Sequence, residues 1–195
     1  MNKPGSMFRW LAVFAAGFVL GIVYSAWRIE KAPSSSPTAL SKAEEQPADQ
    51  EKIAKRIEAV AKMLEKDPNN AQALIQLGND QFDTGNHEKA VEAYEKALRL
   101  DPRNANVITD LGISYRKLGK PELAADSFRK AIQADPDHAK ALFHLGLVLR
   151  KDLNNPKGAL DAWETFLKKA PDHPYVAMVK PGVEQLKQEI AEKKK

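Results

Sequence analysis

The chain has 195 residues, of which 43% are apolar and 29% charged, proportions typical of one helical soluble domain with accessory segments. Its formal charge of +4 comes from 30 basic and 26 acidic residues spread along the sequence, a balance that does not favour nucleic acid as a partner. Cysteine is absent, which excludes disulfide bonds, thiol catalysis and cysteine-ligated metal centres.

The first predicted element is a membrane-spanning helix over residues 10–27. These residues carry no charge, and at about 1.5 Å per residue they would cross roughly 27 Å of bilayer. Trp10 and Trp27 stand at its ends, where interfacial aromatic residues are common. The basic residues before the span outweigh those after it, so the positive-inside rule predicts residues 1–9 in the cytoplasm and the remainder on the periplasmic side of a bacterial inner membrane.

Two alternatives concern this segment. A cleaved signal peptide would also have a basic start and an apolar stretch, but small residues are missing at the cleavage spacing, so we expect a retained anchor. Gly17 and Gly21 form a small-xxx-small pair that would let two spans pack closely, and this allows a homo-oligomer.

Residues 28–50 are predicted to be a flexible linker. They are rich in proline and serine and contain almost no large apolar side chain, so they cannot bury enough surface to become ordered. A flexible segment of about 20 residues would hold the following domain on the order of 25 Å from the bilayer.

Residues 51–68 are predicted to form a single amphipathic helix with an apolar stripe at Ile53, Ile57, Val60 and Leu64. At the other end, residues 174–195 show a similar stripe, interrupted by Pro181-Gly182. Stacked repeats need terminal units with one polar face, and these two helices are the candidates: an N-terminal half-repeat and a C-terminal cap.

A repeated pattern lies between these helices. Leucine-glycine pairs, an alanine, an aromatic residue and a proline recur at intervals of 34 or 35 residues. The positions are Leu77-Gly78, Leu111-Gly112 and Leu145-Gly146; Ala90, Ala124 and Ala159; Tyr94, Phe128 and Trp163; and Pro102, Pro136 and Pro171. This period predicts helical hairpins that stack on one another, because one hairpin is too small to bury its own apolar face.

Each unit is predicted to hold two helices. In the first unit, one stripe includes Leu74 and Leu77 and a second includes Ala90 and Tyr94, both at helical spacing. Glycine-containing turns separate the two helices of the first two units. In the third unit the turn over residues 151–158 is one residue longer, which indicates the end of the regular stack.

These motifs resemble the tetratricopeptide repeat, or TPR. The resemblance implies an all-α, right-handed superhelical solenoid of antiparallel helix pairs, with repeats at residues 71–104, 105–138 and 139–173. It also implies a concave groove, lined by the first helix of each unit, that binds a protein or peptide. The family's groove positions correspond here to Gln72, Ile75, Asn79, Phe82, Asp83, Asn106, Thr109, Ile113, Arg116, Lys117, Lys140, Phe143, Leu147, Arg150 and Lys151.

This set mixes apolar side chains with cations, so we expect a peptide with apolar anchors and acidic groups. TPR domains that clamp a C-terminal carboxylate use two lysines, two asparagines and one arginine. Asn79 and Lys140 match that constellation, whereas Ile75, Asp110 and His144 do not. The resemblance therefore does not extend to the carboxylate clamp.

No motif indicates catalysis. The four histidines form no metal-binding pair, no nucleophile has an evident base, and no glycine-rich loop follows a strand. We therefore expect a protein that is not an enzyme and needs no metal or cofactor.

The function implied is a membrane-anchored adaptor that assembles or presents partner proteins. The anchor and the ending from Ala159 to Pro171 are similar to those of NrfG- and CcmI-like proteins of cytochrome c biogenesis, which implies an apocytochrome partner. Two alternatives remain: a self-associating scaffold, and a periplasmic holdase near the secretion machinery.

Overall fold

The computed structural model describes residues 47–193. The predicted span over residues 10–27, its Gly17-Gly21 pair and most of the predicted linker lie outside these residues. Among the residues described, no helix has the length and apolar character needed to cross a bilayer.

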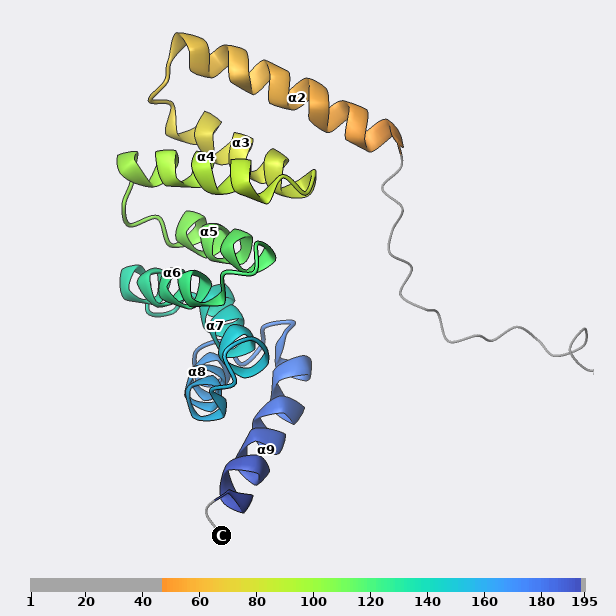
Figure 1. Cartoon of the computed structure of the whole chain (residues 1–195). Coiled ribbons are helices and arrows are strands. Elements are labelled where there is room, and N and C mark those ends of the chain that lie inside the picture. Colours follow the sequence, from red (N-terminus) through yellow and green to blue (C-terminus); the bar gives the residue numbers. More distant parts are fainter. Residues whose placement is uncertain (1–46, 194–195) are drawn as a thin grey trace, which may run out of the picture. The chain divides into compact units, whose positions relative to one another are not determined.

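The described part of the chain is entirely helical and contains no strand (Figure 1). Its helices are α2 (Pro47–Lys66), α3 (Ala71–Asp83), α4 (His87–Leu100), α5 (Ala105–Lys117), α6 (Pro121–Ala134), α7 (Ala139–Lys151), α8 (Pro156–Lys169) and α9 (Val176–Glu192). Each helix packs on the next along the chain, and the closest pairs are α3 with α4, α5 with α6, and α7 with α8. The predicted all-α solenoid of helix pairs is confirmed.

Local sequence explains where these helices begin and turn. Asn70 and Asn104 cap α3 and α5, each accepting a hydrogen bond from the backbone amide three residues on, at 2.9 and 3.2 Å. Gly85 and Gly119 lie in the turns with φ of 77° and 68°, where a side chain would be strained. In the longer third turn Asn154 takes this role with φ of 47°.

The repeated glycine and aromatic residues pack against each other within each unit. A Cβ on Gly112 would come within 2.7 Å of the Phe128 ring. A Cβ on Gly78 or Gly146 would come still closer to the aromatic ring of its own unit. Glycine is therefore required at this position, because the aromatic ring occupies the space that a side chain would need.

The two ends differ from the sequence-based boundaries. Helix α2 begins at Pro47, inside the segment predicted as linker, and proline is favoured in a first helical turn because its fixed φ suits the helix. The predicted C-terminal helix begins at Val176 and continues through Pro181-Gly182, where its apolar stripe is interrupted. Pro181 is exposed, so water can satisfy the carbonyl that loses its partner, and Gly182 lets α9 approach the ring of Trp163.

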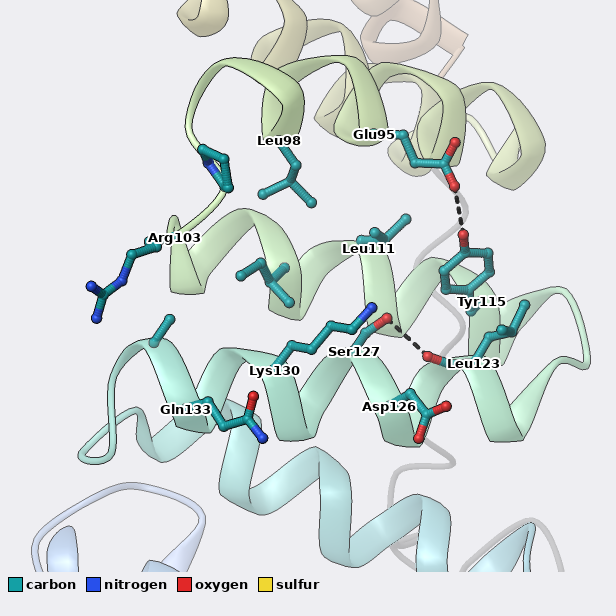
Figure 2. Close-up of a pocket in the computed structure, with 13 residues that line it drawn as sticks. Glu95, Leu98, Arg103, Leu111, Tyr115, Leu123, Asp126, Ser127, Lys130 and Gln133 are labelled. Carbon is teal, nitrogen blue, oxygen red and sulfur yellow. Dashed lines mark hydrogen bonds between the residues drawn. The ribbon is translucent and has the colours of Figure 1, made fainter.

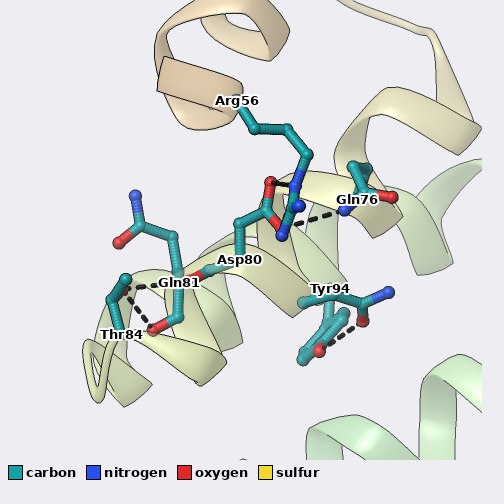
Figure 3. A network of polar contacts seen from close by, with 7 residues as sticks. Arg56, Gln76, Asp80, Gln81, Thr84 and Tyr94 are labelled. Atoms are coloured by element: carbon teal, nitrogen blue, oxygen red, sulfur yellow. Dashed lines mark hydrogen bonds and ion pairs between the residues drawn. The ribbon is translucent and has the colours of Figure 1, made fainter. Parts of the chain in front are cut away.

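Helix α2 is joined to the first unit by a polar network, shown in Figure 3. Arg56 donates from Nε to both oxygens of Asp80, at 2.8 and 2.9 Å, and also from Nη2. Gln76 Nε2 donates to Asp80 Oδ1 at 2.9 Å. Asp80 is fully buried, so this network compensates a charge that would otherwise be costly to bury.

Candidate functional site

The candidate site is a pocket of about 340 Å³ on the face formed by the first helices of the three units. Helices α3, α5 and α7 supply most of its lining, and α4 contributes one side chain. The lining residues are Asn79, Phe82, Asp83, Tyr94, Asp110, Ile113 and Lys140. Sequence reasoning predicted all of these for the groove except Tyr94 and Asp110.

Tyr94 of α4 lines the pocket and fixes the orientation of Asn79. Its hydroxyl donates to Asn79 Oδ1 at 2.8 Å, which directs the amide nitrogen of Asn79 away from the tyrosine. Burial raises the pKa of Tyr94, so the hydroxyl remains a donor at neutral pH. The sequence carried a signal for Tyr94, since it is the aromatic position of the repeat, but that signal indicated packing alone.

An ion pair crosses the pocket between two units. Lys140 Nζ of α7 lies 2.7 Å from Asp110 Oδ1 of α5. Asp83 adds a second carboxylate from α3. The pocket thus combines two carboxylates and one ammonium group with the apolar side chains of Phe82 and Ile113.

Two of the other four predicted groove cations are also engaged, whereas Lys117 and Lys151 are exposed at the ends of their helices. Arg116 pairs with Asp152 at the end of α7. Arg150 donates to Gln185 Oε1 of α9 at 2.6 Å and lies over the ring of Trp163. The predicted cationic strip is therefore largely compensated inside the protein, which removes the main reason to expect an acidic ligand there.

Two predicted groove residues, Thr109 and Phe143, are buried, and their assignment to a partner-contacting surface is corrected. Thr109 is 0% exposed, and its hydroxyl donates to the carbonyl of Ala105 at 2.7 Å. Phe143 is 5% exposed, with its ring centroid 4.2 Å from that of Tyr175, just before α9. The C-terminal segment thus covers a position that is half-buried in the first unit, at Ile75, and buried in the second, at Thr109.

The remaining predicted positions are partly or fully accessible. Ile75 and Leu147 are half-buried and pack against the two larger core clusters. Exposed polar side chains mark both ends of the first helices: Gln72, Asn106, Lys117 and Lys151.

The structure does not build a carboxylate clamp. His144 is stacked on Phe128 with ring centroids 5.6 Å apart, and burial lowers its pKa to about 4, so it is neutral at physiological pH. Asp110 places a negative charge where that constellation needs a donor, and it already holds Lys140. Within residues 47–193, no cluster of histidine and carboxylate side chains could hold a metal ion.

Comparison with known proteins gives a consistent result. Two family models match the chain, "TPR repeat" over residues 78–119 and "Tetratricopeptide repeat" over residues 109–174. No curated protein sequence matches it.

Several solved structures share the fold. A crystal structure of MamA is 26% identical in sequence and superposes with a TM-score of 0.62. The match covers 74% of this chain and 80% of the MamA chain. The first TPR of Spaghetti (RPAP3) bound to the HSP90 peptide SRMEEVD is 23% identical, with 62% and 93% covered and a TM-score of 0.56. The Yersinia enterocolitica type III secretion chaperone SycD with a peptide of the translocator YopD is 19% identical, with 60% and 92% covered and a TM-score of 0.58.

Proposed function

Because the chain contains tetratricopeptide repeats, we propose that it is a protein-interaction adaptor that holds an extended segment of a partner protein in the groove formed by α3, α5 and α7. The observation that carries this proposal is the pocket at Asn79, Phe82 and Ile113, which combines a hydrogen-bonding amide with an apolar wall. A recess of this kind suits one side chain and the adjacent backbone of a peptide.

The polar groups define what the segment presents. Asn79 accepts from Tyr94 through its oxygen, so its amide nitrogen is available to a backbone carbonyl of the ligand. Lys140, the single cation of the pocket lining, is already paired with Asp110, so the lining offers no unpaired cation to an acidic ligand. We therefore propose a segment in which an apolar side chain is flanked by a cationic or amide group, instead of the acidic ligand expected from the sequence.

Two of the structural neighbours support a peptide ligand for this fold, because one was solved with a bound HSP90 peptide and the other with a peptide of YopD. For this chain we propose an unfolded apocytochrome as the partner, on the resemblance of residues 159–171 to NrfG- and CcmI-like proteins.

Replacing Phe82 with alanine is expected to weaken binding of an apocytochrome C-terminal peptide at least tenfold. The half-buried ring forms the apolar wall of the pocket, and a tenfold loss corresponds to about 1.4 kcal/mol. Fluorescence anisotropy with the labelled peptide and the full chain measures the change. Met178→Ala on α9 is the matched control, since Met178 is an exposed apolar side chain that lines neither this pocket nor another recess of the repeats.

The proposal fails if the wild-type chain does not bind the peptide at about 100 μM, which corresponds to roughly −5.5 kcal/mol. Equal losses in the Phe82 and Met178 variants would also contradict it. Equal binding of unrelated unfolded chains would favour the holdase alternative over a dedicated partner.

We also propose that residues 10–27 anchor the protein in the membrane with the repeats on the periplasmic side, because this stretch is uncharged and long enough to span. The full chain is expected to remain in the membrane pellet after carbonate extraction, and a chain lacking residues 1–27 to be released. The absence of native cysteine allows single-cysteine labelling: Ser35→Cys should react with an impermeant maleimide outside spheroplasts, and Ser6→Cys should not.

The reverse labelling pattern would overturn the orientation. Intact mass measurement of the membrane-bound protein provides a separate check, since loss of the first residues would show that the segment is a cleaved signal peptide.

A further inference from the structure

Two further recesses lie on the side of the repeats away from the groove. One, of about 540 Å³, lies between α2 and α4 over α3, and the other, of about 630 Å³, lies between α4 and α6 over α5 (Figure 2). We call them the outer clefts. On α5, Ile108, Leu111 and Tyr115 line the outer cleft, whereas Asp110 and Ile113 line the groove. At about 100° per residue these two sets occupy opposite faces of the helix.

The two outer clefts are equivalent parts of successive units. Leu74 and Leu77 form the floor of the first, and residues 34 positions later, Ile108 and Leu111, form the floor of the second. Lys96 and Lys130 stand on their rims with the same 34-residue separation. The surface therefore offers two similar sites one repeat apart.

The rims carry positive charge that the protein leaves uncompensated. Lys96 and Arg99 line the first cleft, and Arg103 and Lys130 line the second. In the part of the chain that the structure describes, none of these four side chains takes part in an ion pair.

The carboxylates of the second cleft are already engaged. Glu95 accepts a hydrogen bond from the hydroxyl of Tyr115 at 2.6 Å (Figure 2). Asp126 accepts one from Arg129 at 2.8 Å. The hydroxyl of Tyr115 is neutral, so Glu95 keeps its negative charge, whereas the charge of Asp126 is paired with Arg129. The second cleft therefore keeps one cation in excess, and the first has two cations and no carboxylate in its lining. Both surround an apolar floor, which is complementary to an acidic and apolar segment.

Each outer cleft also has one exposed apolar side chain in its lining. Leu100 and Leu123 are 42% and 46% exposed, and each lines one of the two clefts. The next unit differs: Asp137 stands 34 residues after Arg103 and forms an ion pair with Lys169 of α8. That unit therefore has a paired carboxylate where the second cleft has the unpaired cation Arg103 and the first has Asn69.

We propose that the outer clefts form a second docking surface, separate from the groove, for an acidic segment of a partner protein that inserts two apolar side chains. Packed helices lie with axes about 8–10 Å apart, so α4 and α6, which both pack on α5, are at most about 20 Å apart. Anchors roughly 7 to 13 residues apart on a helix reach both clefts at about 1.5 Å per residue. A flat lipid surface would meet the rim cations but would not fill the recesses.

The test uses the full chain and a fluorescein-labelled amphipathic peptide with leucine anchors about 11 residues apart and glutamates beside them. A second peptide carries lysine in place of glutamate. The glutamate peptide should bind at least tenfold more tightly than the lysine peptide. The combined variant Lys96→Glu, Arg99→Glu, Arg103→Glu and Lys130→Glu should weaken that binding at least tenfold. The matched control makes the same change of net charge at exposed lysines elsewhere: Lys89→Glu, Lys120→Glu, Lys157→Glu and Lys168→Glu.

The control variant and Phe82→Ala should both bind the glutamate peptide within twofold of wild type. Circular dichroism melting shows whether each variant is folded, and glutamine replacements at the same four cleft positions serve if the glutamate variant is not. Three results would each overturn the proposal: equal losses in the cleft and control variants, equal binding of the two peptides, or binding of anionic phosphatidylglycerol vesicles without binding of the peptide. Loss of binding in Phe82→Ala would place the peptide in the groove and would also overturn it.

Discussion

Replacing Gly146 with alanine is expected to lower the free energy of unfolding by about 3 kcal/mol. A Cβ at this position would collide with Cδ1 and Nε1 of the Trp163 indole, which is buried between α7 and α8. Overpacking of this kind costs about 1–3 kcal/mol. Movement of the ring would also break the hydrogen bond from Trp163 Nε1 to the carbonyl of Phe143, 3.1 Å long and worth roughly another 1 kcal/mol. Urea denaturation followed by circular dichroism measures the loss.

The matched control is Gly85→Ala in the first turn. No atom lies within 4 Å of a Cβ there, and the φ of 77° costs a side chain only about 1–2 kcal/mol. Helix propensity alone would make alanine more stable than glycine at this position by about 1 kcal/mol. A Gly146→Ala variant that is neutral or more stable than wild type would therefore contradict the tight contact between the glycine and the aromatic ring. Combining Gly146→Ala with Trp163→Leu should cost less than the sum of the two single changes, because the smaller side chain removes the collision.

Replacing Arg56 with alanine is expected to destabilise the attachment of α2 by about 1–3 kcal/mol. Asp80 is 0% exposed and would keep only the hydrogen bond from Gln76, so its buried carboxylate would lose most of its compensation. The estimate stays at the lower end of the values for buried ion pairs because Arg56 is 45% exposed and water screens the interaction. Relative to wild type, amide hydrogen exchange in the Arg56→Ala variant should become faster in α2 and change little in α5.

The repeat itself supplies the control for this change. Arg56 and Asp80 are separated by 24 residues, as are Ala90 and Ser114 in the next unit, where both residues are buried without an ion pair. The double variant Arg56→Ala and Asp80→Ser copies that pair and should recover most of the lost stability. A double variant no more stable than Arg56→Ala would show that the loss does not come from an uncompensated Asp80.

Much of the fold could be predicted because each unit is organised by contacts within about 20 residues of sequence. Gly78 meets Tyr94 and Gly146 meets Trp163, each within one helical hairpin. The glycine turns and the longer third turn also follow from adjacent residues, and the structure confirms them. Pro181-Gly182 interrupts the apolar stripe of α9 without ending the helix, because Pro181 is exposed and water can satisfy the carbonyl that loses its partner.

The candidate site was predictable only in part. Asn79, Phe82 and Ile113 line the pocket as expected from their places in the repeat. Phe143, which stands 34 residues after Thr109 and 68 after Ile75, is instead covered by Tyr175, a contact between the third unit and the C-terminal segment that the repeat pattern does not contain. Family positions state which way a residue points and do not state what lies on top of it.

From the sequence alone came the helical hairpins, their order and the direction in which Phe82 and Ile113 point, because these depend on a period shared by every unit and on short-range packing. Only the tertiary structure decided the charge of the two surfaces. Lys140 is neutralised by Asp110 thirty residues away, whereas Lys96 and Lys130 find no ion-pair partner among residues 47–193. Ion pairing falls off over a few ångströms, so it depends on distances between units that a repeat pattern does not encode.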